Sequence, residues 1–86
     1  MQIQSVRVSV RYLGYLHDIA GQKEDNFQIP TPAHVHDVIS RAAEAHPRLS
    51  KIKDVLVVSV NNHLTRENRE LRDGDSLILI APLVGG

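Results

Sequence analysis

The stretch His34-Val35-His36-Asp37-Val38-Ile39-Ser40-Arg41-Ala42-Ala43 predicts the one long helix of this chain, around which the rest of the fold is arranged. Its apolar residues recur at the spacing i, i+3, i+4, i+7 and i+8, which places them along one side of a helix. They are Val35, Val38, Ile39, Ala42 and Ala43. A helix with one apolar side needs a second layer of structure to bury that side.

The start of this helix has two interpretations. Thr31 before Pro32 is typical of an N-cap followed by proline at the first helical position. Alternatively, His34 is the cap and Asp37 lies in the first turn. In either case Pro47 ends the helix, because proline interrupts helical hydrogen bonding.

Strand-like segments lie on both sides of the helix. The residues Ser5 to Tyr12 alternate strictly between apolar and polar, which predicts a strand with one buried face. A short helix ending at Gly21 follows, with Leu13, Leu16, Ile19 and Ala20 on its apolar side. The further predicted strands are residues 24–29, 55–60, a brief edge strand at 63–65 and 76–81. Asn61-Asn62 and Asp73-Gly74-Asp75 mark turns between them.

Two pairs of strands therefore flank one helix that covers only one face of the sheet. This order predicts an α+β fold of the β-grasp (ubiquitin-like) kind, a mixed sheet of about four to five strands packed on one main helix. We expect residues 1–82 to form the domain and residues 83–86 to form a flexible C-terminal Gly-Gly tail.

The second face of the sheet is predicted to be open, because the first strand carries polar residues on it. The third and last strands nevertheless have apolar residues on both faces, and an exposed apolar patch on a small domain usually marks a partner surface. The alternative is that loops cover it. The residues expected at the partner interface are Val58, Leu77, Leu79 and Ala81.

Composition excludes several classes of function. The chain of 86 residues is long enough to form one modest hydrophobic core. Its 10 basic and 10 acidic residues balance, so the sequence predicts no basic surface for binding nucleic acid or an anionic membrane. No apolar run reaches membrane-spanning length and no signal peptide is evident, so a cytoplasmic location is expected. The absence of cysteine excludes disulfides and thiolate chemistry.

Neither a metal site nor a catalytic assembly is predicted. The five histidines do not recur at a metal-ligand spacing, so we expect them to lie on the surface. His46 is expected near the C-terminal end of the main helix, where it interacts favourably with the helix dipole. The serines lack a nucleophile-elbow pattern, and no phosphate-binding glycine loop is present. The chain is therefore not expected to be an enzyme on its own or to bind a cofactor.

The end of the chain, Ala81-Pro82-Leu83-Val84-Gly85-Gly86, carries the one group suited to chemistry. Pro82 is expected to end strand pairing, and Gly85 and Gly86 allow the backbone to thread a narrow channel. The expected recognition segment is Pro82, Leu83, Val84 and Gly85, and the reactive group is the Gly86 carboxylate. A carboxylate is a poor acyl donor until attack on the α-phosphate of ATP makes it an acyl-adenylate. ATP and Mg²⁺ must then be used by a partner enzyme.

These residues resemble the ubiquitin-like sulfur carriers of the MoaD/ThiS family, and within it the small subunit of molybdopterin synthase. Residues 12–21 stand in register with the family's Tyr-Phe-Ala-x-Leu-x-Glu-x-Ala-Gly segment, and residues 34–38 are similar to its helix start. Residues 58–61 resemble its Val-Ala-Val-Asn strand, residues 71–75 its Leu-x-Asp-Gly-Asp turn, and residues 81–86 its Pro-Pro-x-x-Gly-Gly end. Ala81 replaces the first of the two usual prolines, and His34 stands where threonine is common.

The resemblance implies a mechanism and its partners. An adenylating enzyme of the ubiquitin-activating type, MoeB- or ThiF-like, would activate Gly86, and sulfur delivery would give a Gly86 thiocarboxylate. The tail would then enter a MoaE-like large subunit of molybdopterin synthase, which transfers the sulfur to a pterin precursor. Alternatives remain: a protein modifier joined through Gly86 to lysines, a carrier for thiamin or tRNA thiolation, or a plain interaction module.

Overall fold

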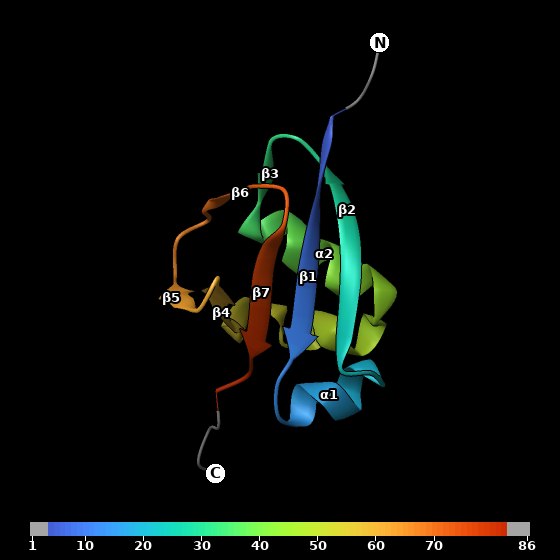
Figure 1. The fold of residues 1–86 in the computed structure, drawn as a ribbon. Coiled ribbons are helices and arrows are strands. Elements are labelled where there is room, and N and C mark those ends of the chain that lie inside the picture. The colour runs from blue at the N-terminus through green and yellow to red at the C-terminus, as the bar shows by residue number, and fades with distance from the viewer. Residues whose placement is uncertain (1–3, 83–86) are drawn as a thin grey trace.

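A computed structural model describes residues 4–82 of the chain (Figure 1). The first half contains β1 (Ser5–Tyr12), α1 (Tyr15–Ala20), β2 (Glu24–Pro30), β3 (Ala33–His34) and α2 (Val35–Ala45). The second half contains the 3₁₀ helices η1 (Pro47–Lys51) and η2 (Lys53–Val55), then β4 (Val57–Val60), β5 (His63–Thr65), β6 (Glu70–Leu71) and β7 (Asp75–Ile80). No helix in the described range is long and apolar enough to cross a membrane.

One mixed sheet of five strands, in the order β2-β1-β7-β4-β5, forms the centre of the molecule. The neighbouring strands β1 and β7 are parallel, and the other three pairings are antiparallel. The helix α2 lies behind this sheet in Figure 1 and leaves the front face of β1, β2 and β7 uncovered. A second, two-stranded sheet pairs β3 with β6. The predicted β-grasp fold is confirmed.

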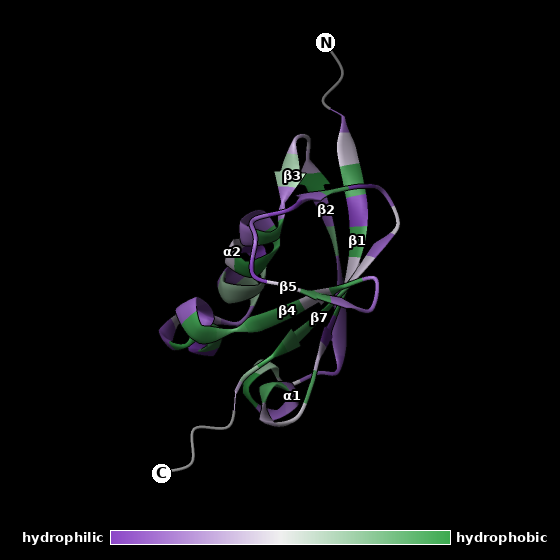
Figure 2. Ribbon diagram, turned by 90° about the vertical axis from the view of Figure 1, so that its left-hand side faces the viewer, coloured by the Kyte–Doolittle hydropathy of each residue, from purple (hydrophilic) through white to green (hydrophobic). Residues whose placement is uncertain are grey.

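Alternation decides which side of β1 is buried. Val6, Val8, Val10 and Tyr12 are all buried, as predicted, and the residues between them face the uncovered side of the sheet. Figure 2 shows the same alternation as hydrophobic and hydrophilic bands along β1, whereas β4 and β7 are mostly hydrophobic. The core therefore lies between one face of the sheet and α2, with Leu16 and Leu49 closing it.

His34 is the N-cap of α2, so the second interpretation of the helix start is confirmed. The His34 amide donates to Asp37 Oδ2 at 2.8 Å, which satisfies one of the free N–H groups at the helix start. Thr31 is not the cap, because its amide donates to the Gln4 carbonyl at 2.9 Å beyond the end of β2. The pairing of β3 with β6 then occupies the two residues before the helix.

The short helix α1 is confirmed, with one correction. Gly21 follows it with φ 78°, the left-handed conformation that glycine adopts easily. Leu13 lies outside the helix and is 41% exposed, because Gly14 with φ 61° turns the chain between β1 and α1. The predicted contribution of Leu13 to the apolar side of this helix is therefore wrong.

The segment after α2 is more regular than predicted, and the strand that follows it is shorter. The helix ends at Ala45 before Pro47, as expected, and the chain continues through η1 and η2. Val55 belongs to η2 and is 56% exposed, so β4 starts only at Val57. Asn61 and Asn62 have φ of 49° and 71° and join β4 to β5, as the turn signal predicted.

Candidate functional site

The last strand, β7, leads directly to the C-terminal segment that the sequence predicts to be reactive. β7 ends at Ile80, Ala81 is still buried, and the exposed Pro82 is the last described residue. Leu83, Val84, Gly85 and Gly86 lie outside the described residues, so the roles assigned to them from sequence stay predictions. The structure does describe the surface around Ile80, Ala81 and Pro82, which precede that segment.

The four side chains predicted at the partner interface lie in the core of the domain. Their exposed fractions are 3% for Val58, 1% for Leu77, 0% for Leu79 and 9% for Ala81. The register explains this, because Val10 pairs with Leu77 and Tyr12 with Leu79, on the face that α2 covers. The predicted placement of these four side chains on an open face is therefore wrong.

The apolar side chains of the open face belong to residues that alternate along the strands with those four buried ones. Val57 pairs with Ile80, and Ser59 lies between Ile78 on β7 and Leu64 on β5. Leu64 is 71% exposed, and Leu13 continues the outward alternation of β1. We define the docking patch as Leu13, Val57, Leu64, Ile78 and Ile80.

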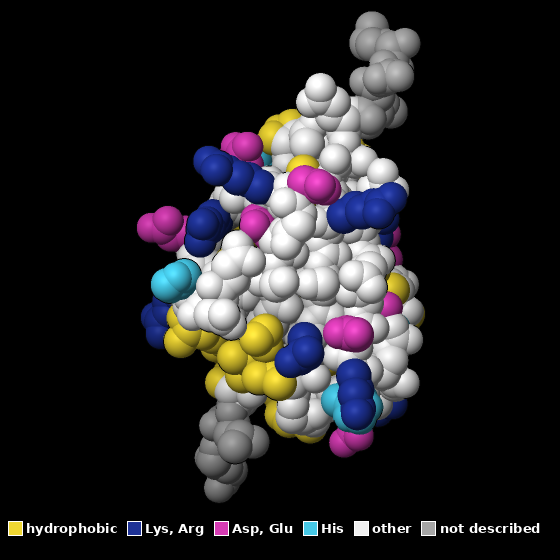
Figure 3. Space-filling view, in the orientation of Figure 1, with side chains coloured by type: hydrophobic (Ala, Val, Ile, Leu, Met, Phe, Trp, Pro, Cys, Tyr) yellow, Lys and Arg dark blue, Asp and Glu magenta, His cyan; other side chains and the backbone are white. Residues whose placement is uncertain are grey.

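Figure 3 shows apolar side chains gathered on the uncovered face close to the start of the C-terminal segment. The rest of that face is polar: Ser9 Oγ donates to Ser76 Oγ at 3.2 Å, and the exposed Arg11 pairs with Ile78 across the strands. An apolar patch with a polar surround is typical of a protein-binding surface. The patch includes Ile80, two residues before Pro82, the last described residue.

A groove of about 640 Å³ is lined by residues of α2, η2, β4 and β5, and it shares Val57 with the docking patch. Its apolar lining includes Val35, Ile39 and Leu56, and Pro82 lies at its border. Lys53 and Arg66 line it together with Asp54 and Glu67, so positive and negative charges balance there. In residues 4–82, no three His, Asp or Glu side chains gather as a metal site would require.

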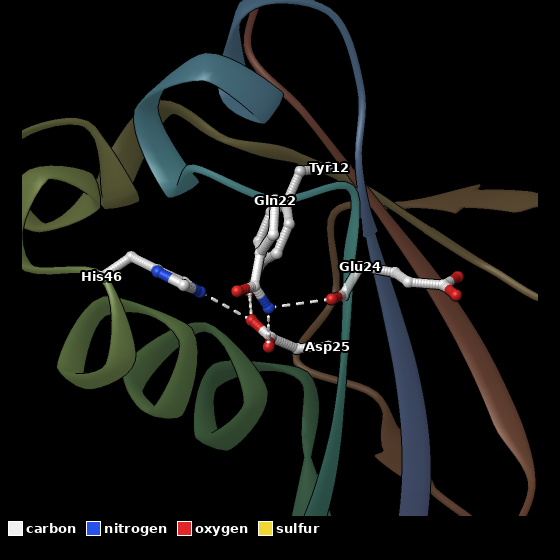
Figure 4. A network of polar contacts seen from close by, with 5 residues as sticks. All are labelled: Tyr12, Gln22, Glu24, Asp25 and His46. Atoms are coloured by element: carbon white, nitrogen blue, oxygen red, sulfur yellow. Dashed lines mark hydrogen bonds and ion pairs between the residues drawn. The ribbon is translucent and has the colours of Figure 1, made fainter.

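A buried polar network ties the end of β1 to the end of α2 (Figure 4). The Tyr12 hydroxyl donates to Asp25 Oδ2 at 2.7 Å, and His46 Nε2 lies 2.7 Å from the same oxygen. Gln22 donates to the other oxygen of Asp25 and to the Glu24 carbonyl. The rings of Tyr12 and His46 meet edge to face, with centroids 5.5 Å apart. His46 is thus not the surface histidine that the sequence predicted, since its side chain is only 13% exposed.

The network also changes the acidity of its tyrosine. Burial of the Tyr12 hydroxyl raises the pKa of Tyr12 far above its ordinary value, and the hydrogen bond to Asp25 and the negative charge of Asp25 act in the same direction. Tyr12 therefore stays protonated and keeps donating to Asp25. No sequence pattern predicts this contact, because Asp25 and His46 meet only through the packing of α2 on the sheet.

Comparisons with known proteins converge on one family. The model of the ThiS family matches residues 10–86. A protein of Chlamydomonas reinhardtii named molybdopterin synthase sulfur carrier subunit is 30% identical over 83 residues, which cover 94% of this chain and 100% of that protein.

Solved structures show the same likeness. A Pyrococcus furiosus protein provisionally described as subunit 1 of a molybdopterin converting factor is 26% identical, with a TM-score of 0.82, covering 92% of this chain and 100% of that one. A chain from the complex of subunits 1 and 2 of the molybdopterin-converting factor of Helicobacter pylori is 29% identical, with a TM-score of 0.61, covering 94% and 100%. SAMP1 of Haloferax volcanii, at 24% identity, a TM-score of 0.81 and coverage of 93% and 99%, shows the fold alone.

Proposed function

Because the chain belongs to the ThiS family, we propose that it is the sulfur carrier subunit of a molybdopterin synthase. The observation that carries this proposal is the match, over the whole length of the relative, to a protein named molybdopterin synthase sulfur carrier subunit. In this role the chain is not catalytic by itself: it brings sulfur, bound at Gly86, to the synthase during molybdenum cofactor biosynthesis. The expected cytoplasmic location is part of the same proposal.

The chemistry takes place at the Gly86 carboxylate. One carboxylate oxygen attacks the α-phosphate of ATP, pyrophosphate leaves, and an acyl-adenylate forms. A hydrosulfide ion then attacks the carbonyl carbon, AMP leaves with that carboxylate oxygen, and the terminus becomes a thiocarboxylate. Gly85 and Gly86 have no side chains that would block entry into the narrow sites where both steps occur.

Activation requires a partner, which we propose is an adenylating enzyme of the ubiquitin-activating type, MoeB- or ThiF-like. This enzyme would hold ATP and Mg²⁺, because the chain offers no glycine loop for phosphates and no cluster of carboxylates for the ion in its described part. Recognition would use Pro82, Leu83, Val84 and Gly85, the segment between the domain and the reacting carbon.

Sulfur transfer requires a second partner, a MoaE-like large subunit. The complex of subunits 1 and 2 from Helicobacter pylori, one chain of which matches this one, supports a partner of that kind. The docking patch is the surface we propose it covers, since burial of apolar area is favourable by about 25 cal/mol per Å². A partner on the patch also holds the tail near its own active site, which raises the effective concentration of Gly86 there.

Intact-mass spectrometry tests the carrier chemistry. The chain is incubated with the adenylating enzyme of the same organism, ATP and a sulfur donor. The expected result is a mass change of one oxygen-to-sulfur exchange. A variant extended by one alanine after Gly86 should show no change, because its carboxylate no longer follows the two glycines. An unchanged mass with an enzyme that forms the adenylate would contradict the proposal.

The rival role as a protein modifier uses the same adenylate but ends differently. A modifier would be recovered from cells covalently attached to lysines through Gly86, whereas a synthase subunit would be recovered with a large subunit held without a covalent bond. Affinity capture followed by denaturing elution separates the two. A series of lysine conjugates without the large subunit would favour the modifier.

A further inference from the structure

Backbone hydrogen bonds and two buried side chains, Tyr12 and Leu16, hold the junction between β1 and α1. The Leu13 amide donates to the Leu79 carbonyl at 3.1 Å, and the amides of Leu16 and His17 donate to the carbonyls of Leu13 and Gly14 at 3.2 and 3.1 Å. α1 itself has only six residues, too few to be stable without packing. The conformation of the junction therefore depends on its neighbours.

This junction presents two exposed apolar side chains. Leu13 is 41% exposed and Tyr15 is 42% exposed, and Gly14 between them has φ 61° and ψ −135°. Leu13 belongs to the docking patch, and Tyr15 is the first residue of α1. Both side chains change direction if the turn at Gly14 changes.

The residue just before the junction is Tyr12, and its hydroxyl group is held by the polar network (Figure 4). Asp25 accepts hydrogen bonds from Tyr12, Gln22 and His46, and it is only 18% exposed at its side chain. The contacts of Asp25 with Tyr12 and His46 are partly buried, and a hydrogen-bond network shielded from water restrains its members more than an exposed one. His46 caps the end of α2, so the network joins this junction to the main helix.

We propose that Tyr12, Asp25 and His46 are positioning residues that hold the β1–α1 junction in the conformation that presents Leu13 and Tyr15 to the large subunit. This inference rests on the proposed function for the identity of the partner. The claim that the network holds the junction does not depend on sulfur chemistry. The network lies on the helix side of the sheet, whereas Leu13 continues the outward alternation. Its effect on binding is therefore transmitted through the backbone of Tyr12 and Leu13.

Two variants remove the hydrogen bonds and keep the rings. His46→Phe retains the edge-to-face contact with Tyr12, and Tyr12→Phe retains the buried ring while removing its hydroxyl. Hydrogen exchange is measured on the full chain without a partner. We expect exchange at the Leu13 and Leu16 amides to become faster by on the order of tenfold, while exchange at the Val58 and Val60 amides in β4 stays unchanged.

The second readout is affinity for the large subunit of the same organism. Both variants should bind about tenfold more weakly, a change within the range of coupling through packed residues. The matched control is Leu71→Ala, which removes buried side-chain atoms in β6, at the other end of the domain from the junction (Figure 1). This control should lose stability but keep its affinity for the large subunit.

The outcomes separate the inference from the proposed function. Unchanged exchange at Leu13 and Leu16 in both variants overturns the inference, whatever the chain does with sulfur. Faster exchange with unchanged affinity also overturns it, because the network would then serve stability alone. If Leu71→Ala weakens binding as much as the two network variants do, the inference is overturned as well. A wild-type chain that does not bind the large subunit overturns the proposed function, and the exchange comparison still decides whether the network holds the junction.

Discussion

The last strand, β7, carries apolar residues on both faces of the sheet, and the two faces differ in what covers them. On β7, Leu77 and Leu79 are almost completely buried beneath α2, whereas Ile78 and Ile80, their neighbours in sequence, remain partly exposed on the uncovered face. The covered face stabilises the domain. The open face leaves apolar area in water, and that area becomes favourable only when a partner covers it. Hydrophobicity alone therefore does not distinguish core from interface in this fold.

The largest expected difference between the faces is in stability. Leu79→Ala should lower the free energy of unfolding by about 2–5 kcal/mol, because it leaves a cavity in a fully buried position. Ile78→Ala, the neighbour on the open face, should cost less than about 1 kcal/mol. Urea unfolding of both variants measures the difference. Equal losses would contradict the assignment of the two faces.

The open face should respond in binding instead. Leu64→Asp places a charge on the most exposed residue of the docking patch, so affinity for the large subunit should fall by about 2 kcal/mol, or roughly 30-fold. Its unfolding free energy should change by less than about 0.5 kcal/mol. The matched control is Asn26→Asp, on the same face but away from the tail, which should bind like the wild type. Calorimetric titration gives the affinities.

A smaller effect is expected at the start of the helix that covers the core. Asp37→Ala removes the acceptor of the His34 amide and should cost about 1 kcal/mol of stability. Because α2 lies on the covered face, affinity for the large subunit should not change. Asp54→Ala, at an exposed position in η2, is the control for loss of a surface charge. Loss of binding by Asp37→Ala alone would mean that the two faces are not independent.

The smallest effect appears only in alkaline solution. The folded chain raises the pKa of Tyr12 above its unfolded value of about 10, so the stability contributed by this group is present below about pH 10 and is lost as pH rises further. Tyr12→Phe should remove this alkaline decrease, whereas Tyr15→Phe, at an exposed position, should keep it. Urea midpoints measured from neutral pH to about pH 11 test the expectation. A wild-type midpoint that does not fall would contradict it.

Local signals predicted most of the fold. The alternation of β1, the stop at Pro47, and the turns at Asn61-Asn62 and Gly74 depend on residues close together in sequence. The correct face of β4 and β7 could not be predicted in the same way, because both of their faces are apolar. That choice depends on the pairing of Val10 with Leu77, a contact between opposite ends of the chain.

The candidate site was only partly predictable for the same reason. The motif at Gly85-Gly86 can be read directly from the sequence, and it carries the proposed chemistry. The docking patch and the contact of Asp25 with His46 are made by residues that only the folded chain brings together. The predicted surface role of His46 failed because the packing of α2 on the sheet encloses its ring.

Transfer of sulfur from Gly86 is the central claim, and one measurement tests it most directly. The thiocarboxylated chain is mixed with the large subunit and its pterin substrate, and the intact mass of the chain is recorded over time. We predict that the mass returns to that of the free carboxylate while sulfur appears in the pterin product. A thiocarboxylate that persists in the presence of an active large subunit, or a chain that ends attached to a lysine, would contradict the account.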